Sequence, residues 1–133
     1  MSTSNRVHFD VVGSYLRPAE LKEARARHAA GQITGAQLRS VEDRLIAQLV
    51  RQQKAHGLRY ITDGEYRRSY WHLDFMWGFQ GVEHIELDHG YQFHGEETTH
   101  GSLRLTGRIS GERHPFIQDF LFVKQFEEAD VEA

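Results

Sequence analysis

The sequence contains no cysteine among its 133 residues, and this absence excludes several kinds of site. The chain has no disulfide framework, no thiolate nucleophile and no Cys-rich zinc site of its own. It also lacks long apolar runs, and its first residues, MSTSNRVHFD, have no apolar core of the type found in signal peptides. We therefore expect a cytoplasmic protein.

An excess of charge of one sign is also lacking. The formal net charge is −3 with nine histidines counted as neutral. This gives no basic field of the kind that nucleic acid or an anionic membrane requires, so we expect neither as a partner. The length suits one domain with a core of its own, and we expect residues 1–133 to form a single domain.

Prolines are scarce as well, and both stand where a helix can begin. Pro18 precedes AELKEARARHAA, a run of strong helix formers that ends before Gly31. Thr34 can cap a second helix, which has apolar residues at spacings of three and four and stops at Gly57. Pro115 opens a third helix. Four apolar residues follow Pro115 at spacings that favour one face: Phe116, Phe120, Val123 and Phe126.

Extended segments separate these predicted helices. His8–Val12 and Leu58–Thr62 are predicted strands, and the order strand, helices, strand predicts a parallel sheet with helices outside it. Later, YQFHGEETT and SLRLTGRI predict an inserted antiparallel hairpin that turns at His100 and Gly101. A third strand is expected to begin at the last residues. Two strand–helix units cannot close an eight-stranded barrel of roughly 250 residues, so we expect the opening part of a larger α/β fold.

The two predicted parallel strands lead into polar residues that we expect at one ligand-binding face. Ser14, after Gly13, offers a hydroxyl and a backbone N–H to a carboxylate, and Glu65 of the Asp-Gly-Glu sequence offers a negative charge to an ammonium group. Together they predict a clamp for a zwitterionic amino acid. In the alternative interpretation, Ser14 only caps a turn and Glu65 pairs at the surface with Arg67 or Arg68.

Aromatic rings and arginines follow in EYRRSYWHLDFMWGF. Such rings can stack on a flat heterocycle, and arginine can bind its carboxylates. The alternative is that the rings only form a core under the hairpin, as Trp71, Phe75, Trp77 and Phe79. Four histidines raise the question of a metal, but their spacings fit no compact ligand motif: His84, His89, His94 and His100.

These segments together resemble the cobalamin-independent methionine synthase family, and most closely its short single-barrel members. The likeness is carried by VVGSYLRP, GLRYITDGEYRRSYWHLDF and HPFIQDFLFVK, and it extends from Phe9 over nearly the whole chain. It implies the N-terminal part of a TIM (β/α)8 barrel with the hairpin inserted. It also implies 5-methyltetrahydropteroyltriglutamate–homocysteine S-methyltransferase activity, in which a methyl group passes from a folate to the zinc-bound thiolate of homocysteine in methionine biosynthesis.

The resemblance also implies roles for individual residues. Glu65 would bind the amino group of homocysteine. The homocysteine carboxylate would be bound by Val12, Gly13 and Ser14. Three residues are candidates for the vicinity of the folate: Arg68, Trp71 and Arg104. The family's zinc ligands are a His-x-Cys pair, an acidic residue and a further cysteine from the later half of the barrel. These ligands are absent from this chain, so we expect no turnover by the chain alone.

Two alternatives stay open. In the first, the chain is part of another zinc-dependent thiol alkyltransferase, with the same kind of barrel but different chemistry. It could also be a truncated, non-catalytic fragment that acts as an oligomeric binding module and pairs strand edges that an open barrel leaves exposed.

Overall fold

A computed structural model of the chain describes residues 11–70, 72–90, 92–93, 96–97 and 100–133. These residues form two compact units. Unit 1 comprises the described residues up to Arg67 together with Phe122–Ala133, and unit 2 comprises those of Arg68–Leu121. The fold is mixed α/β, with two-stranded antiparallel sheets. The single domain and the partial barrel stay predictions.

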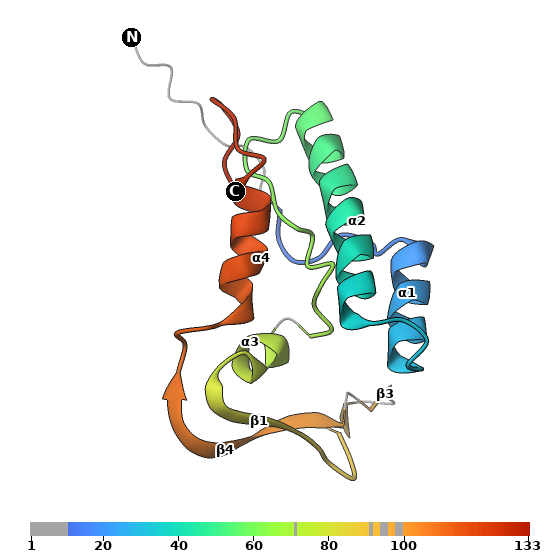
Figure 1. The fold of residues 1–133 in the computed structure, drawn as a ribbon, viewed down its shortest axis with the longest axis vertical. Coiled ribbons are helices and arrows are strands. Elements are labelled where there is room, and N and C mark those ends of the chain that lie inside the picture. The colour runs from blue at the N-terminus through green and yellow to red at the C-terminus, as the bar shows by residue number, and fades with distance from the viewer. Residues whose placement is uncertain (1–10, 71, 91, 94–95, 98–99) are drawn as a thin grey trace. The chain divides into compact units, whose positions relative to one another are not determined.

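Two helices that lie side by side make up much of unit 1 (Figure 1). Helix α1 spans Ala19–Ala29 and begins directly after Pro18, and helix α2 spans Gly35–Ala55. The Thr34 hydroxyl accepts a hydrogen bond from the N–H of Gln37 at 3.2 Å, and the Gln37 side chain accepts one from the N–H of Thr34 at 2.8 Å. This capping box satisfies two donors at the start of α2. Both helices confirm the predictions.

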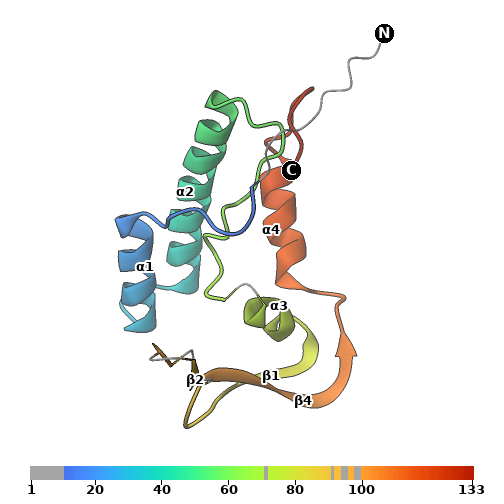
Figure 2. The ribbon, with the colours of Figure 1, turned by 180° about the vertical axis from the view of Figure 1, so that it is seen from behind.

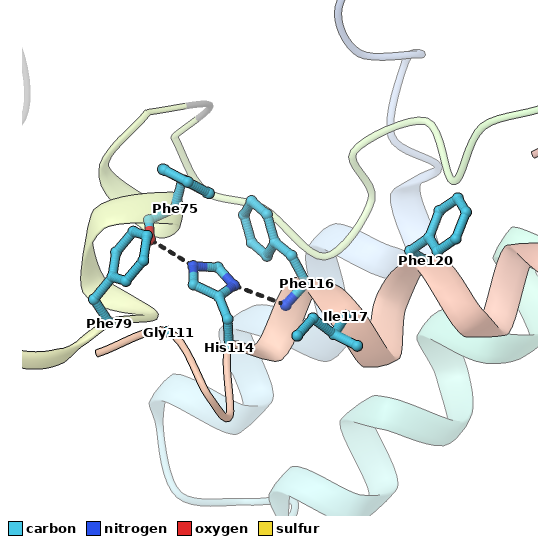
Figure 3. A pocket seen from close by; sticks show the side chains of 7 residues that line it. All are labelled: Phe75, Phe79, Gly111, His114, Phe116, Ile117 and Phe120. Carbon is cyan, nitrogen blue, oxygen red and sulfur yellow. Dashed lines mark hydrogen bonds between the residues drawn. The ribbon is translucent and has the colours of Figure 1, made fainter. Parts of the chain in front are cut away.

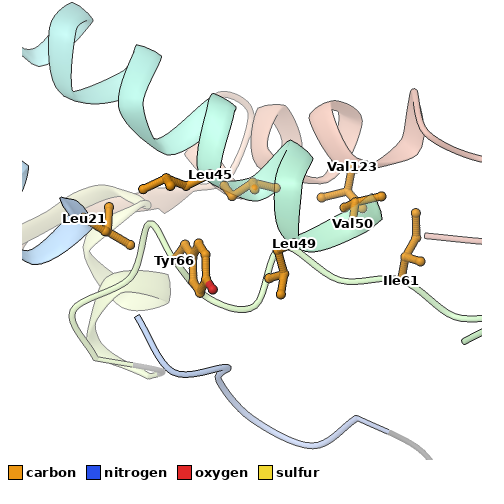
Figure 4. Packing of buried hydrophobic residues seen from close by; sticks show 8 residues of the cluster. Leu21, Leu45, Leu49, Val50, Ile61, Tyr66 and Val123 are labelled. Carbon is orange, nitrogen blue, oxygen red and sulfur yellow. The ribbon is translucent and has the colours of Figure 1, made fainter. Parts of the chain in front are cut away.

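The core of unit 1 is apolar and forms along one face of α2 (Figure 4). Residues at spacings of one, three and four along α2 point to the same side, as an amphipathic helix requires. Each core side chain is at most 6% exposed: Leu21, Leu45, Ile46, Leu49, Val50, Ile61, Tyr66 and Val123. Burial of one such side chain contributes roughly 1.5–3 kcal/mol. The turn that carries Glu65 therefore has a packed core beside it, because Tyr66 belongs to this cluster.

The expected strand Leu58–Thr62 is present as a single parallel bridge between Tyr60 and Glu132. The N–H of Ile61 donates to the carbonyl oxygen of Glu132 at 2.8 Å, and the N–H of Glu132 donates to that of Arg59 at 2.9 Å. The pairing is parallel, as predicted, and it involves the residues at which the third strand was expected to begin.

The first expected strand, His8–Val12, lies mostly outside the described residues. Its last two residues, Val11 and Val12, are described outside any strand, and the Val12 side chain is 92% exposed. The prediction of a buried strand end at Val12 is therefore wrong. A run of β-branched residues becomes buried only where a neighbouring strand or helix covers it, and the sequence pattern does not supply that neighbour.

A twisted hairpin dominates unit 2 (Figure 2). Strand β1, Gln80–Glu86, pairs antiparallel with β4, Gly101–Ser110. The second predicted arm, SLRLTGRI, lies in β4 and is confirmed. The predicted first arm, YQFHGEETT, lies partly outside the described residues. Its predicted pairing through a turn at His100 and Gly101 is wrong, because the described partner of β4 is β1, further upstream. Between β1 and β4 in the chain, β2 (Gln92–Phe93) pairs with β3 (Glu96–Glu97).

Two further helices complete the described fold. Helix α3 spans Leu73–Trp77, which the sequence pattern did not predict. Helix α4 spans Pro115–Lys124 and begins at the predicted proline. Along α4, Val123 is 4% exposed and Phe120 is 50% exposed. Among the described helices, none combines the length and the apolar character that crossing a membrane requires.

Candidate functional site

Two segments that are far apart in the sequence meet in unit 1 and form the candidate site. The N–H of Tyr15 donates to the carbonyl oxygen of Gly64 at 3.2 Å. This hydrogen bond joins GSYLRP to the Asp-Gly-Glu turn. Ser14 and Glu65 each adjoin one of its two residues in the chain, so the structure brings together the two segments from which the clamp was predicted.

The turn that carries Glu65 has a left-handed backbone at both central positions. The φ angle is 65° at Gly64 and 57° at Glu65, and the N–H of Tyr66 donates to the carbonyl oxygen of Asp63 at 3.3 Å. Positive φ at both central residues is the pattern of a type I′ turn. This conformation costs a non-glycine residue about 1–2 kcal/mol. Such residues collect at functional sites, where the surrounding contacts enforce them.

Three side chains donate to or accept from the backbone of this turn: Asp63, Arg17 and Arg25. The Asp63 carboxylate accepts a hydrogen bond from the N–H of Glu65 at 2.9 Å. The guanidinium of Arg17 donates to the carbonyl oxygen of Glu65 at 2.8 Å, and that of Arg25 donates to the carbonyl oxygen of Tyr66 at 2.7 Å. The turn is thus held by contacts on both sides of Glu65.

The predicted carboxylate-binding residues are exposed. Gly13 and Ser14 are both exposed. Apart from Gly13 itself and its two chain neighbours, no atom of the described residues lies within 4 Å of the position that a Cβ at Gly13 would occupy. Glu65 is half-buried. An exposed hydroxyl and open backbone on one segment and a carboxylate on the neighbouring segment supply the two kinds of group that a zwitterion requires.

Arg67 does not lie on the surface, contrary to one part of the alternative interpretation. Its side chain is 6% exposed and its guanidinium binds two acidic residues of α2, Glu42 at 3.1 Å and Asp43 at 2.5 Å. Burial raises the pKa of the Glu42 carboxyl above its ordinary value, even though the ion pair with Arg67 acts in the opposite direction. Arg67 therefore ties the end of the turn to α2.

The candidates for the folate vicinity belong to unit 2 or lie outside the described residues. The Arg68 guanidinium lies over the ring of Phe116, 4.3 Å from its centroid. Arg104 on β4 pairs with Glu83 on β1 at 2.7 Å, and both side chains are exposed. Trp71 lies outside the described residues. Arg68 and Arg104 thus each contact a residue of unit 2.

An apolar pocket of about 410 Å³ is present in unit 2 (Figure 3). Its lining is mostly aromatic: Phe75, Phe79, Gly111, His114, Phe116, Ile117 and Phe120. The His114 Nδ1 accepts the N–H of Phe116 at 3.1 Å, so Nε2 carries the proton and donates to the carbonyl oxygen of Phe75 at 2.8 Å. Sequence reasoning missed His114. The available signal was its position before Pro115, where a side chain can cap a helix.

Trp77, from the aromatic segment EYRRSYWHLDFMWGF, packs against the hairpin, as the alternative interpretation expected. The Trp77 indole donates to the carbonyl oxygen of Ser102 on β4 at 2.9 Å and stacks on His84 of β1, with ring centroids 3.8 Å apart. His84 also pairs with Glu86 at 2.8 Å. Among the described residues, no three His, Asp or Glu side chains gather in a way that could hold a metal ion. His94 lies outside the described residues.

Comparison with known proteins gives relatives of greater length. No protein-family profile matches the chain. It is 44% identical over 116 residues to the uncharacterized protein YxjH of Bacillus subtilis, which covers 87% of this chain and 31% of that protein. It is 31% identical over 87 residues to the methionine synthase of Sulfolobus acidocaldarius, which covers 62% of this chain and 26% of that protein.

A solved structure is similar over most of the chain. A Listeria monocytogenes protein, provisionally described as a vitamin-B12-independent methionine synthase, superposes with a TM-score of 0.72 at 40% identity. The match covers 92% of this chain and 33% of that one. The chain therefore spans about a third of the length of the first relatives it matches.

Proposed function

We propose that this chain supplies the homocysteine-binding part of a cobalamin-independent methionine synthase, an enzyme that transfers a methyl group from a folate to homocysteine. Similarity to the Sulfolobus and Listeria proteins supports the enzyme class. The parallel bridge between Tyr60 and Glu132 supports the proposal that the chain is the N-terminal part of a TIM barrel. Since the chain spans about a third of these relatives, the proposal for its own residues is limited to substrate binding.

One observation carries the proposed binding role, namely the hydrogen bond between Tyr15 and Gly64. It joins the segment of Val12, Gly13 and Ser14 to that of Glu65. In the proposal, the backbone of the first segment and the Ser14 hydroxyl bind the homocysteine carboxylate. The Glu65 carboxylate binds the ammonium group. Charge-assisted hydrogen bonds of this kind are roughly twice as strong as neutral ones.

The folate is proposed to approach Arg68, Trp71 and Arg104. Arg104 is exposed and pairs with Glu83, and an exposed pair of this type contributes at most about 1 kcal/mol. An anionic glutamyl tail can therefore replace Glu83 at small cost. The chain's partners in this proposal are homocysteine and a methyl-folate.

Zinc is implied by the enzyme class, and the described residues do not fit it. The chain has no cysteine, and within its described part no three suitable side chains come together. A thiol of pKa near 8.5 is mostly protonated at pH 7, and the thiolate is the nucleophile. We therefore expect no methyl transfer by these residues alone when zinc and a folate donor are added.

Calorimetric titration of the purified chain with L-homocysteine tests the proposal. The parent chain should bind, and Glu65→Gln should weaken binding by about ten- to hundredfold, or roughly 1.5–3 kcal/mol. Glu23→Gln, which removes an exposed carboxylate from α1, is the matched control and should bind as the parent does. Equal binding by the parent and Glu65→Gln, or no binding by the parent at millimolar ligand, would contradict the proposal.

A second candidate function is that of a non-catalytic binding module that self-associates. The sequence analysis left this alternative open, with exposed strand edges as the surfaces that pair. The apolar side chains of unit 2 favour it, since six of the described ones are between 44% and 50% exposed: Phe75, Met76, Leu87, Ile117, Phe120 and Leu121. Sedimentation velocity measures this directly. A concentration-dependent dimer would support the candidate, and a compact monomer at high concentration would exclude it.

A further inference from the structure

Arg17 connects the two segments of the candidate site from within GSYLRP itself. Its Nη2 donates to the carbonyl oxygen of Glu65 at 2.8 Å, across 48 positions of the sequence. Arg25 makes the equivalent contact with the next carbonyl, that of Tyr66, at 2.7 Å. Two consecutive carbonyl groups of the turn are thus each bound by an arginine from the N-terminal part of unit 1.

The contact of Arg17 completes a set that fixes both peptide groups flanking Glu65. The preceding peptide is held at both ends, because Tyr15 binds the carbonyl oxygen of Gly64 and Asp63 binds the N–H of Glu65. The following peptide is held at its carbonyl oxygen by Arg17. When both flanking peptide planes are fixed, φ and ψ are fixed, and so is the direction of the Cα–Cβ bond.

This matters because Glu65 occupies a backbone conformation that glutamate disfavours, with φ at 57°. Without its contacts the residue would relax toward negative φ, which lowers its energy by about 1–2 kcal/mol. That rotation would carry the carboxylate to a different position. A charged donor suits the task, since hydrogen bonds to charged groups are the stronger ones.

We infer that Arg17 is a positioning residue for Glu65, which it holds in the left-handed conformation so that the carboxylate meets the ammonium group of the substrate. The inference rests on the proposed binding of homocysteine. Arg17 acts here through the backbone of Glu65 and not through contact with the ligand. Arg25 supports the same turn one residue later and lacks this effect on the Glu65 side chain.

The test compares two ligands, L-homocysteine and 4-mercaptobutanoate, which lacks the ammonium group. Calorimetry of the full chain should show that Arg17→Ala weakens homocysteine binding by about tenfold and leaves binding of 4-mercaptobutanoate unchanged. Arg17→Lys, which retains a charged donor, should recover part of the loss. Arg25→Ala is the matched control and should preserve the preference for homocysteine.

Two outcomes separate failure of the inference from failure of the proposed function. An equal loss for both ligands in Arg17→Ala would assign Arg17 a purely structural role and overturn the inference. A parent chain that does not prefer homocysteine over 4-mercaptobutanoate would overturn the role of Glu65 itself. Amide hydrogen exchange at Glu65 needs no ligand: it should accelerate in Arg17→Ala and not in Arg25→Ala, and an unchanged rate in Arg17→Ala would also overturn the inference.

Discussion

The two units of the molecule are stabilised in different ways. Unit 1 buries a continuous apolar cluster, in which Ile46 and Val50 are fully inaccessible to solvent. Unit 2 has few buried apolar side chains among its described residues, and its rings are held by polar contacts of His114 and Trp77. The candidate clamp belongs to the unit with the packed core. A strained turn needs such support, because its conformation persists only if the surroundings do not yield.

The largest expected effect is loss of a core side chain in unit 1. Ile46→Ala should lower the free energy of unfolding by about 2–5 kcal/mol, because it removes buried methyl groups and leaves a cavity. Phe120→Ala in unit 2 is the comparison and should cost about 1 kcal/mol or less, since half of that side chain is already exposed. Urea denaturation followed by circular dichroism measures both, and equal costs would contradict the distinction between the units.

The next effect concerns the turn itself. A Cβ at Gly64 would lie 2.5 Å from Leu49 Cδ2, and φ there is 65°. Gly64→Ala should therefore lower the free energy of unfolding by about 2–4 kcal/mol, from backbone strain and overpacking together. Gly57 has a φ of 77° and open space at its Cβ position, so Gly57→Ala isolates the backbone cost of about 1–2 kcal/mol. Equal losses would mean that Leu49 moves away freely.

Unit 2 should depend on the polar contacts of His114. His114→Ala should lower the free energy of unfolding by about 1–3 kcal/mol, because a buried ring is removed and two backbone groups lose its hydrogen bonds. His100→Ala is the control on the same unit, since His100 is exposed, and we expect a change within about 0.5 kcal/mol. Thermal unfolding of the two variants measures this difference. An unchanged stability of His114→Ala would mean that the packing of the other rings alone stabilises the pocket.

The smallest effect is a dependence of stability on pH that arises from Glu42. Burial raises the pKa of Glu42 in the folded state above its ordinary value of 4.5. In the pH interval between the two values the folded state binds more protons, so this contribution to stability is full below pH 4.5 and is lost as the pH rises through the folded pKa. Glu42→Gln should remove that slope from unfolding free energies measured between pH 4 and 7, and an unaltered slope would assign it to other groups.

Local signals in the sequence predict the helices α1, α2 and α4 and one arm of the hairpin, but not the short helix α3. Pro18, the capping box at Thr34 and Pro115 each act over a few residues, so a single sequence contains enough information to place α1, α2 and α4. Strand β1 was missed because QGVEHIE has little apolar alternation and its pairing with β4 is settled by distant residues.

The candidate site was predictable only in part, for the same reason. Strand–loop order placed Ser14 and Glu65 at one edge, and their segments do meet through Tyr15 and Gly64. The contact of Arg17 could not be predicted from the sequence. Its guanidinium binds a backbone carbonyl oxygen 48 positions away, and no residue spacing indicates such a contact. Whether Val12, Gly13, Ser14 and Glu65 bind homocysteine stays a prediction until the titration is made.

The bridge between Tyr60 and Glu132 makes unit 1 discontinuous along the chain, with unit 2 inserted into it. During synthesis, the helices α1 and α2 leave the ribosome long before the residues that complete their unit. The buried Val123 and the hydrogen bonds of Glu132 form only after the whole insertion has been made. Closing that loop costs entropy that grows only with the logarithm of its length, about 0.6 kcal/mol for each doubling. A change in the length of the insertion should therefore cost little stability. Loss of the final residues would instead leave the core beside α1 and α2 incomplete.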